Sequence, residues 1–363
     1  MIIFSMLQSI LSLSKQLISI PSTKENPKEI LKVLEVAEKA VGKGFCVDRF
    51  EKNGSPSLLI HNQKPGTKKF KIILDAHLDV VPGKDYQYKP YEKDGKFYGR
   101  GAYDMKAPGA AEILVFKELA KKVSYPLALQ LVTDEEIGGF NGAKHQIDEG
   151  VRADFTIAGE STELGIKNAA KGIIWANIKA RGQAAHGAYL WQGKNAIWMI
   201  QRALNALETK FSEPKKEVWK TTINVSKINS SNDIYNKVAE DCVLGIDVRF
   251  IPEDAKTIVD KIKNLLPKDV ELEVLVYEPA QFTPESNKYV TLLKNASKEI
   301  TGKRAEIIIK HGGSDIRHFN RVGCEGVEYG PHGHGIHTDE EWVDIKSLKE
   351  YYEILKNFLL SLK

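Results

Sequence analysis

The stretch Ile72-Ile-Leu-Asp-Ala-His77-Leu-Asp79-Val-Val-Pro82 decides the fold that we predict for this chain. It begins as a short apolar run with β-branched residues, which is typical of a buried strand, and its proline ends the hydrogen-bonding ladder. Because residues two apart in a strand point to the same side, the His77 ring and the Asp79 carboxylate leave the strand end together. One side chain of such a pair can bind a cation while the other orients it. A hydrogen-bonded His–Asp pair without a metal is the alternative, and this stretch alone leaves both open.

Two further predicted strands also end in carboxylates. The apolar run Leu127–Val132 is followed by Asp-Glu135-Glu136, and the run Asp154–Ala158 is followed by Glu160. Helical patterns separate these strands, which is typical of an α/β sheet, where ligands bind outside the carboxyl ends of the strands. Adjacent carboxylates repel one another unless a positive charge lies nearby, so a cation is their natural partner. A solvent-facing acidic turn is the alternative for each segment taken alone.

Two glycine-rich loops add further candidate ligands. Asp104 lies in Gly99-Arg-Gly-Ala-Tyr-Asp104-Met-Lys, near the predicted start of a helix whose dipole stabilises a carboxylate. A simple N-cap role is the alternative for this aspartate. The loop Gly330–Glu341 carries three histidines among glycines, and together with the acidic strand ends it predicts at least one histidine ligand.

The residues from Lys171 to Pro279 follow a different pattern from those on either side. Strand and helix patterns occur there in the order β-α-β-β-α-β, which predicts a small inserted domain with a ferredoxin-like α+β arrangement. Residues 1–170 and 280–363 then form one α/β domain around the strand that ends at His77. The inserted domain holds His186 in a loop of small residues, where a plain surface histidine is the alternative to a functional one.

Length and composition indicate a globular protein of two domains. Its 363 residues include 42% hydrophobic residues, enough for two cores. With 52 basic and 48 acidic residues, the net charge of +4 favours neither a nucleic-acid-binding nor a membrane-binding protein. The cysteines lie far apart, so neither a disulfide framework nor a thiolate metal site is indicated. Polar residues interrupt the apolar N-terminal segment, which favours an amphipathic helix over a signal peptide and predicts a cytoplasmic protein.

Taken together, these motifs resemble one family, the two-zinc amidohydrolases and exopeptidases that include aminoacylase, acetylornithine deacetylase, succinyl-diaminopimelate desuccinylase and glutamate carboxypeptidase. The resemblance covers essentially the whole chain, because the motifs occur in the family's order. It implies a zinc-exopeptidase-like α/β/α catalytic domain, with residues 171–279 as an inserted lid and dimerisation domain. The motifs are His77-Leu-Asp79-Val-Val-Pro, Gly99-Arg-Gly-Ala-Tyr-Asp104-Met-Lys, Asp134-Glu-Glu136, Gly159-Glu160, Ala185-His186, Gly312-Gly-Ser-Asp-Ile-Arg317 and His337-Thr-Asp-Glu-Glu341.

The resemblance also implies a centre of two Zn²⁺ ions per chain, with Co²⁺ or Mn²⁺ as substitutes. Each ion would be held by one histidine, one glutamate and a shared aspartate, a set of donors that suits Zn²⁺. The peptide bond after the bridging aspartate is expected to be cis. The implied ligands are His77 and Glu160 at one ion, Glu136 and His337 at the other, and Asp104 as the bridge.

Catalytic and substrate-binding roles follow from the same resemblance. Glu135 would be the general base that takes a proton from metal-bound water to give the hydroxide nucleophile, and Asp79 would orient a ligand histidine. His186 would stabilise the oxyanion, often in the site of a neighbouring subunit. The substrate carboxylate would pair with Arg317, with Arg249 and Asn236 as weaker candidates.

The expected reaction is hydrolysis of the amide bond of a small N-acyl amino acid, of the deacetylase or desuccinylase kind. An exopeptidase acting on short peptides, either a dipeptidase or a carboxypeptidase, is the alternative, because both use the same centre. A non-catalytic relative is a third hypothesis, but such a protein should have lost a ligand or the base, and this sequence retains both. We expect a homodimer through the lid domain, with neither nucleic acid nor membrane as a partner.

Overall fold

The computed structural model describes residues 2–362, with side chains from residue 6 onward, and shows a mixed α/β fold, as the sequence predicts. The chain divides into two compact units. Unit 1 comprises Met1–Ala169, Phe282–Lys310 and Ser314–Lys363, and unit 2 comprises Ala170–Gln281 and His311–Gly313. Unit 2 therefore interrupts the chain of unit 1, and each unit has its own hydrophobic core.

The main sheet of unit 1 is mixed. Strands β6, β3, β7 and β15 run parallel to one another in its middle, while β2 and β8 pair antiparallel at either side of them. The order across the sheet is β1 (Cys46–Lys52), β2 (Ser55–His61), β6 (Leu127–Val132), β3 (Lys69–His77), β7 (Arg152–Ala158), β15 (Glu325–Glu328), β8 (Ile166–Ala170) and β13 (Gln281–Phe282), with β14 (Ile307–Lys310) paired to β8.

The central strand β3 explains why the acidic segments meet. It lies between β6 and β7, both parallel to it, and His77 is level with Val132 at the end of β6. On the other side, Asp75 is level with Ala158 at the end of β7. The carboxyl ends of all three strands therefore lie at one edge of the sheet, as predicted, and the residues that follow them share this edge.

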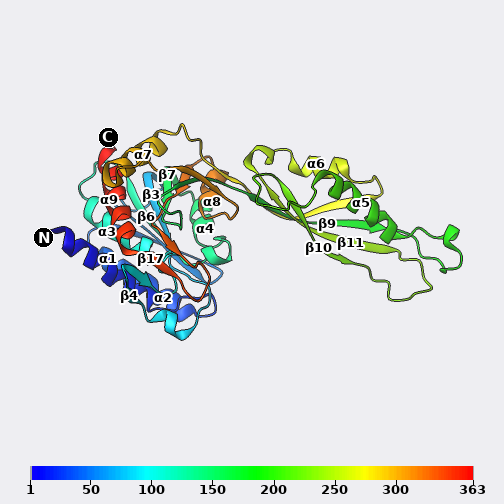
Figure 1. Cartoon of the computed structure of the whole chain (residues 1–363), viewed down its shortest axis with the longest axis horizontal. Helices are drawn as coiled ribbons and strands as arrows, with labels where there is room; N and C mark the ends of the chain where they lie inside the picture. The colour runs from blue at the N-terminus through cyan, green and yellow to red at the C-terminus, as the bar shows by residue number, and fades with distance from the viewer. Residues whose placement is uncertain (1, 363) are drawn as a thin grey trace. The chain divides into compact units, whose positions relative to one another are not determined.

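Helices cover both faces of this sheet. Ile72 and Leu74 of β3 pack into the larger core, while Ile73, which points to the opposite face, packs into a second one. Figure 1 shows α1, α3 and α9 side by side on the first face. The larger core includes α1 (Ile2–Ile18), α2 (Pro27–Val41), α3 (Lys106–Leu119), α7 (Lys288–Thr301) and α9 (Ile345–Ser361), and the second includes α4 (Ala143–Asp148) and α8 (Ile316–Arg321).

A small second sheet in unit 1 joins two segments that are far apart in sequence. Its order is β16 (Gly333–His334), β17 (Trp342–Asp344), β5 (Lys96–Tyr98) and β4 (Tyr91–Lys93). Because β17 pairs with β5, the chain before Asp104 is held beside the chain after His337. This sheet was not part of the prediction, and it positions two candidate ligands.

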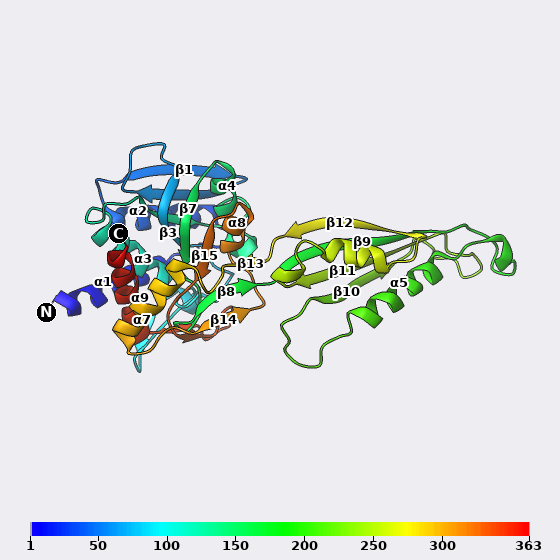
Figure 2. The same ribbon diagram turned by 90° about the horizontal axis from the view of Figure 1, so that it is seen from above.

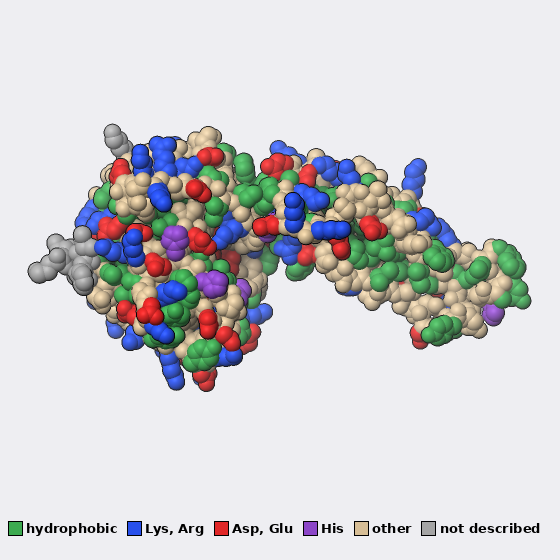
Figure 3. Space-filling view, in the orientation of Figure 1, with side chains coloured by type: hydrophobic (Ala, Val, Ile, Leu, Met, Phe, Trp, Pro, Cys, Tyr) green, Lys and Arg blue, Asp and Glu red, His purple; other side chains and the backbone are tan. Residues whose placement is uncertain are grey.

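Unit 2 has the predicted β-α-β-β-α-β order. Its four strands form an antiparallel sheet in the ferredoxin-like order β10-β11-β9-β12, so β10 and β12 are edge strands. Both helices cover the same face of the sheet (Figure 2), and apolar side chains gather on the surface of the unit (Figure 3). The elements are β9 (Gly172–Arg181), α5 (Ala196–Lys210), β10 (Thr222–Asn229), β11 (Asp241–Phe250), α6 (Ile258–Leu265) and β12 (Val270–Glu278).

The structure differs from the prediction mainly in short elements. The segment 311–319, expected to be a loop, contains the start of helix α8, and the hairpin of β4 and β5 lies in a segment expected to be irregular. None of the helices within residues 2–362 combines the length and the apolar character needed to cross a membrane.

Candidate metal centre

His77 lies at the carboxyl end of β3 and is only 2% exposed. Its Nδ1 lies 3.1 Å from the backbone oxygen of Asp79, which can only accept a hydrogen bond, so Nδ1 carries a proton. The other ring nitrogen, Nε2, points away from the strand, 3.1 Å from Asp104 Oδ1 and 3.7 Å from Glu160 Oε1. The backbone of Asp79 thus fixes the tautomer that leaves Nε2 able to bind a metal ion.

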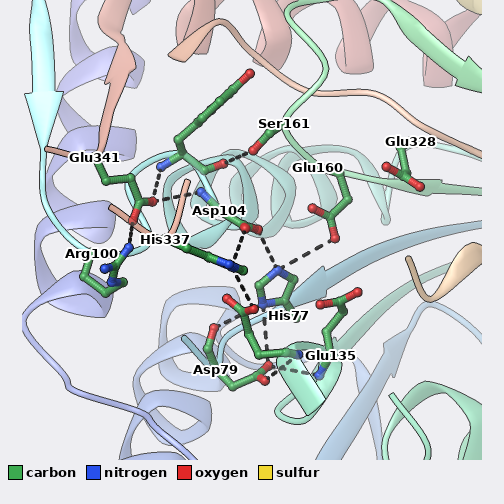
Figure 4. Close-up of polar contacts among 12 residues, drawn as sticks. His77, Asp79, Arg100, Asp104, Glu135, Glu160, Ser161, Glu328, His337 and Glu341 are labelled. Atoms are coloured by element: carbon green, nitrogen blue, oxygen red, sulfur yellow. Dashed lines mark hydrogen bonds and ion pairs between the residues drawn. The ribbon is translucent and has the colours of Figure 1, made fainter. Parts of the chain in front are cut away.

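Asp104 lies between two histidines (Figure 4). Its Oδ1 faces His77, while its Oδ2 lies 3.3 Å from Nε2 of His337. The same Nε2 of His337 is 3.0 Å from Oε2 of Glu136. Each oxygen of Asp104 is therefore directed at a different histidine, which is the arrangement required of a bridging carboxylate. The peptide bond between Asp104 and Met105 is cis, as the family resemblance implied.

The potential donor atoms form two groups at this edge of the sheet. In each group, the donor atoms lie within 4.8 Å of one another, close enough to hold a metal ion. Imidazole nitrogen and carboxylate oxygen are ligands that suit Zn²⁺. The structure thus brings together all five residues predicted as ligands and also Glu135. One group is His77, Glu135 and Glu160, and the other is Asp104, Glu136 and His337.

The electrostatics of this edge also fit bound cations. Burial raises the pKa of Glu135 to about 8, and burial together with the charge of Asp104 raises the pKa of Glu160 well above its usual range. Contacts with Asp104 and Glu136 raise the pKa of His337 to about 10. So many partly buried carboxylates close together are costly to ionise unless positive charge lies among them. Divalent cations would supply that charge, so these residues fit a metal centre.

Asp79 holds the turn that carries the two glutamates. Its Oδ1 accepts a hydrogen bond from the backbone N–H of Glu135 at 3.4 Å, and its Oδ2 accepts one from the backbone N–H of Glu136 at 3.1 Å. Since its backbone oxygen also contacts the His77 ring, Asp79 links two of the strand ends at the centre. This geometry extends the prediction that Asp79 only orients the histidine.

An ion pair that the sequence analysis missed supports Asp104. Glu341 Oε1 accepts hydrogen bonds from the backbone N–H groups of Tyr103 at 2.9 Å and Asp104 at 3.1 Å. Its Oε2 lies 2.7 Å from Nη1 of Arg100, and this pair is buried. Arg100 Nη2 also donates to the backbone oxygen of Thr338, next to His337. Arg100 lies in the family motif that contains Asp104, and Glu341 lies in the motif that begins at His337. Their places in these motifs were the signal that could have indicated them.

Arg317, predicted to bind the substrate carboxylate, lies at the start of α8 in unit 1 and is 7% exposed. Its Nη1 donates to the backbone oxygen of Ser314 at 2.9 Å, and its Nη2 donates to the backbone oxygen of Gly138 at 2.6 Å. Gly138 follows the turn that carries Glu135 and Glu136. Arg317 is thus attached to the backbone of the candidate centre.

The other predicted substrate and oxyanion residues belong to unit 2. Arg249 pairs with Asp247 through two hydrogen bonds, of 2.8 and 3.0 Å. Asn236 is exposed, and its backbone oxygen accepts a hydrogen bond from Gly187 in the loop of His186. His186 is also exposed, and its Nδ1 accepts a hydrogen bond of 3.1 Å from the backbone N–H of Ala188. The proton of a neutral His186 is therefore on Nε2.

Another group of potential donors, Cys46, Asp48 and His61, lies on β1 and β2. Its geometry argues against a metal site. The backbone N–H of Gln63 donates to Nδ1 of His61 at 3.2 Å, so the proton of a neutral ring is on Nε2, which is 3.2 Å from Asp48 Oδ2. A metal ion at Nε2 would leave the ring with no proton, so this group is explained by a hydrogen bond between His61 and Asp48.

Comparison with known proteins gives a consistent result. Residues 73–361 match peptidase family M20/M25/M40. The succinyl-diaminopimelate desuccinylase of Pelagibacter ubique is 29% identical to this chain, covering 96% of the chain and 98% of the relative. The aminopeptidase PepT of Bacillus cereus superimposes with a TM-score of 0.75 at 22% identity, covering 97% of this chain and 98% of that one, and so shares the fold. A tripeptidase of Staphylococcus aureus gives 0.73 at 25% identity, covering 97% of both chains.

Proposed function

Because this chain belongs to peptidase family M20/M25/M40, and so to the metal-dependent hydrolases of amide bonds, we propose that it removes the acyl group from a small N-acyl amino acid. The observation that carries this proposal is Asp104, which directs one oxygen at each of two histidines, with Glu135 in the adjoining group. Similarity to a succinyl-diaminopimelate desuccinylase over nearly the whole chain favours N-succinyl amino acids as the first substrates to test.

The residues at the edge of the sheet would hold two metal ions per chain, and we propose Zn²⁺ on the basis of the donor types. When bound, such ions polarise the scissile carbonyl and make water a strong nucleophile at neutral pH. His77 and Glu160 would serve one ion, Glu136 and His337 the other, and Asp104 both.

Glu135 is the residue that we propose to move the proton. It lies in the group with His77 and Glu160, it is half-buried, and Asp79 accepts a hydrogen bond from its backbone N–H. Its carboxylate would take a proton from the attacking water and give it to the nitrogen of the leaving amine. Asp79 would act as a positioning residue, since it holds the glutamate turn and the His77 ring.

The protein would bind its substrate through two further groups. His186 carries its proton on Nε2, which suits it to donate a hydrogen bond to an oxyanion. Arg317 is proposed to pair with the carboxylate of the amino acid. Arg249 and Asn236 stay the weaker candidates, and Arg249 is already paired with Asp247.

We propose that two copies assemble through unit 2. Its sheet has two edge strands, β10 and β12, and an unpaired edge can pair with another chain. Exposed apolar side chains lie on both edges, among them Ile228 at 51% and Leu275 at 55%. A cytoplasmic location stays a prediction.

An exopeptidase is the second candidate function. The tripeptidase of Staphylococcus aureus, at 25% identity, is the observation that favours it. The two functions are separated by measuring hydrolysis of N-acetyl and N-succinyl amino acids beside dipeptides and tripeptides, with protein stripped by a chelator and reloaded with zinc. Faster cleavage of the acyl amino acids supports the deacylase, and faster cleavage of peptides supports the alternative. No cleavage of either class by metal-loaded protein would contradict both.

A further inference from the structure

A pocket of about 590 Å³ in unit 1 adjoins the candidate metal centre. Asp79 and Glu136, both part of the centre, contribute to its wall. Much of the remaining wall is apolar, including Val81 and Ile137, and Ile137 is 40% exposed. A pocket next to reacting atoms with mainly apolar walls suits a short hydrocarbon chain.

One ammonium group lines this pocket. Lys24 lies in the turn before α2, and its side chain is exposed. Within the described part of the chain, Lys24 takes part in no ion pair, and the neighbouring Glu25, which also lines the pocket, takes part in none. A single ammonium beside an apolar wall suits a chain that ends in a carboxylate, because a charge-assisted hydrogen bond then forms at the end of an apolar contact.

The pocket and the residue proposed to bind the amino-acid carboxylate lie at different parts of one turn. The turn carries Glu135 and Glu136; Ile137 lines the pocket, while the next residue, Gly138, accepts a hydrogen bond from Arg317. Neither Arg317 nor another residue of the 311–319 segment lines the pocket. For a substrate with its amide at the metal centre and its amino-acid carboxylate at Arg317, this pocket therefore offers a separate space for the acyl chain.

We propose that this pocket binds the acyl chain of the substrate and that Lys24 pairs with the carboxylate at the end of that chain. The inference rests on the proposed function, because it places the amide bond at the metal centre. It assigns the preference for a dicarboxylic acyl group, such as succinyl, to a lysine outside the residues that hold the metal ions.

The test compares N-succinyl and N-butanoyl derivatives of one amino acid, which have acyl chains of equal length but differ in the terminal charge. Lys24→Met should lower kcat/KM for the succinyl substrate by about tenfold or more, the effect of a hydrogen bond to a charged group. The butanoyl substrate should be hydrolysed as fast as by wild type. Lys24→Arg should retain most of the succinyl activity. Lys28→Met, at an exposed lysine of α2 that does not line the pocket, is the matched control and should change neither rate.

An equal effect of Lys24→Met on both substrates, or no effect on either, would overturn the inference. A selective loss on Glu25→Gln instead would also overturn it, because the pocket would then bind a cation. Failure of the proposed function is a separate result, since wild type would then hydrolyse neither substrate. In that event, the role of Lys24 is still tested by measuring the binding of succinate to the zinc-loaded protein by calorimetry. If the inference holds, Lys24→Met should weaken that binding.

Discussion

Arg100 and Glu341 form a buried ion pair with 2.7 Å between Nη1 and Oε2, although 241 residues separate them in the sequence. Through this pair the segment that ends in Asp104 is attached to the loop that carries His337. The two candidate ligands are thus held together by residues that bind no metal themselves. Outer contacts of this kind orient the ligands of a metal ion.

We expect Glu341→Ala to weaken both the fold and the metal centre. The substitution removes the acceptor for the backbone N–H of Asp104 and leaves the Arg100 charge buried, which costs about 3–5 kcal/mol. It should also weaken metal binding by about 10–100-fold. Urea unfolding measures the first effect and competition with a chelator the second. The exposed neighbour Glu340 gives the control Glu340→Ala, and metal affinity equal to wild type would contradict the supporting role of Glu341.

We expect Glu135→Gln to lower kcat by about 10²–10⁴-fold with metal content unchanged, because the residue is proposed to move a proton and not to bind metal. Glu136→Gln is the paired variant, and it should lose metal. The readouts are steady-state kinetics and elemental analysis of the same preparations. If Glu135→Gln loses metal and Glu136→Gln keeps it, the roles of the two glutamates have been exchanged.

The sequence was sufficient to predict the parts of the centre that follow parallel strands. Each of β3, β6 and β7 is an apolar run, the runs are separated by helical pattern, and parallel strands place their carboxyl ends at one edge, so His77 and Glu160 could be expected to meet. The roles of Asp104 and His337 came from family resemblance. The sheet that joins their segments has strands of only two or three residues, too short to show a period of two.

The role of Arg100 and Glu341 could not be predicted from local pattern, because it depends on a contact between distant segments. Helix α8 was missed for another reason. With six residues it is less than two turns long, and its glycine-rich approach is typical of a loop.

We expect the protein to bind two divalent ions per chain. The two groups of donors share no residue, so each group can hold one ion. Asp104 belongs to the group of His337 but also faces His77 of the other group, so it can contribute an oxygen to both ions. Protein stripped by a chelator and titrated with zinc should approach two equivalents by elemental analysis. Saturation near one equivalent would exclude the bridging role of Asp104.

We expect a homodimer, with a mass in solution near twice the chain mass of 40.6 kDa by light scattering. Ile228→Lys places a charge on the exposed edge strand β10 and should shift the mass toward the monomer. The control is Leu360→Lys on α9 in unit 1, a side chain of similar exposure, 54% against 51%, which should leave the dimer intact. A wild-type monomer at micromolar concentration would refute the proposed assembly.

Arg317 has two contrasting explanations, and the last prediction separates them. In the first, its guanidinium pairs with the substrate carboxylate; in the second, it only holds the turn of Glu135 and Glu136 through the oxygen of Gly138. Arg317→Lys should impair both roles, because an ammonium cannot reproduce the two-pronged geometry of a guanidinium. A loss of activity by itself therefore does not distinguish them.

The substrate distinguishes the two roles. If Arg317 pairs with the carboxylate, Arg317→Lys should lower kcat/KM on the free acid. The loss should correspond to about 1.5–3 kcal/mol of transition-state stabilisation, the range for a hydrogen bond to a charged group. On the corresponding amide the loss should largely disappear, because that interaction is then absent from wild type and variant alike. A residue that only positions the glutamate turn should cause the same loss on both substrates and should lower kcat rather than raise KM. Equal losses on the acid and the amide would therefore assign Arg317 to the turn, and Arg249 would be the next residue to test for the carboxylate.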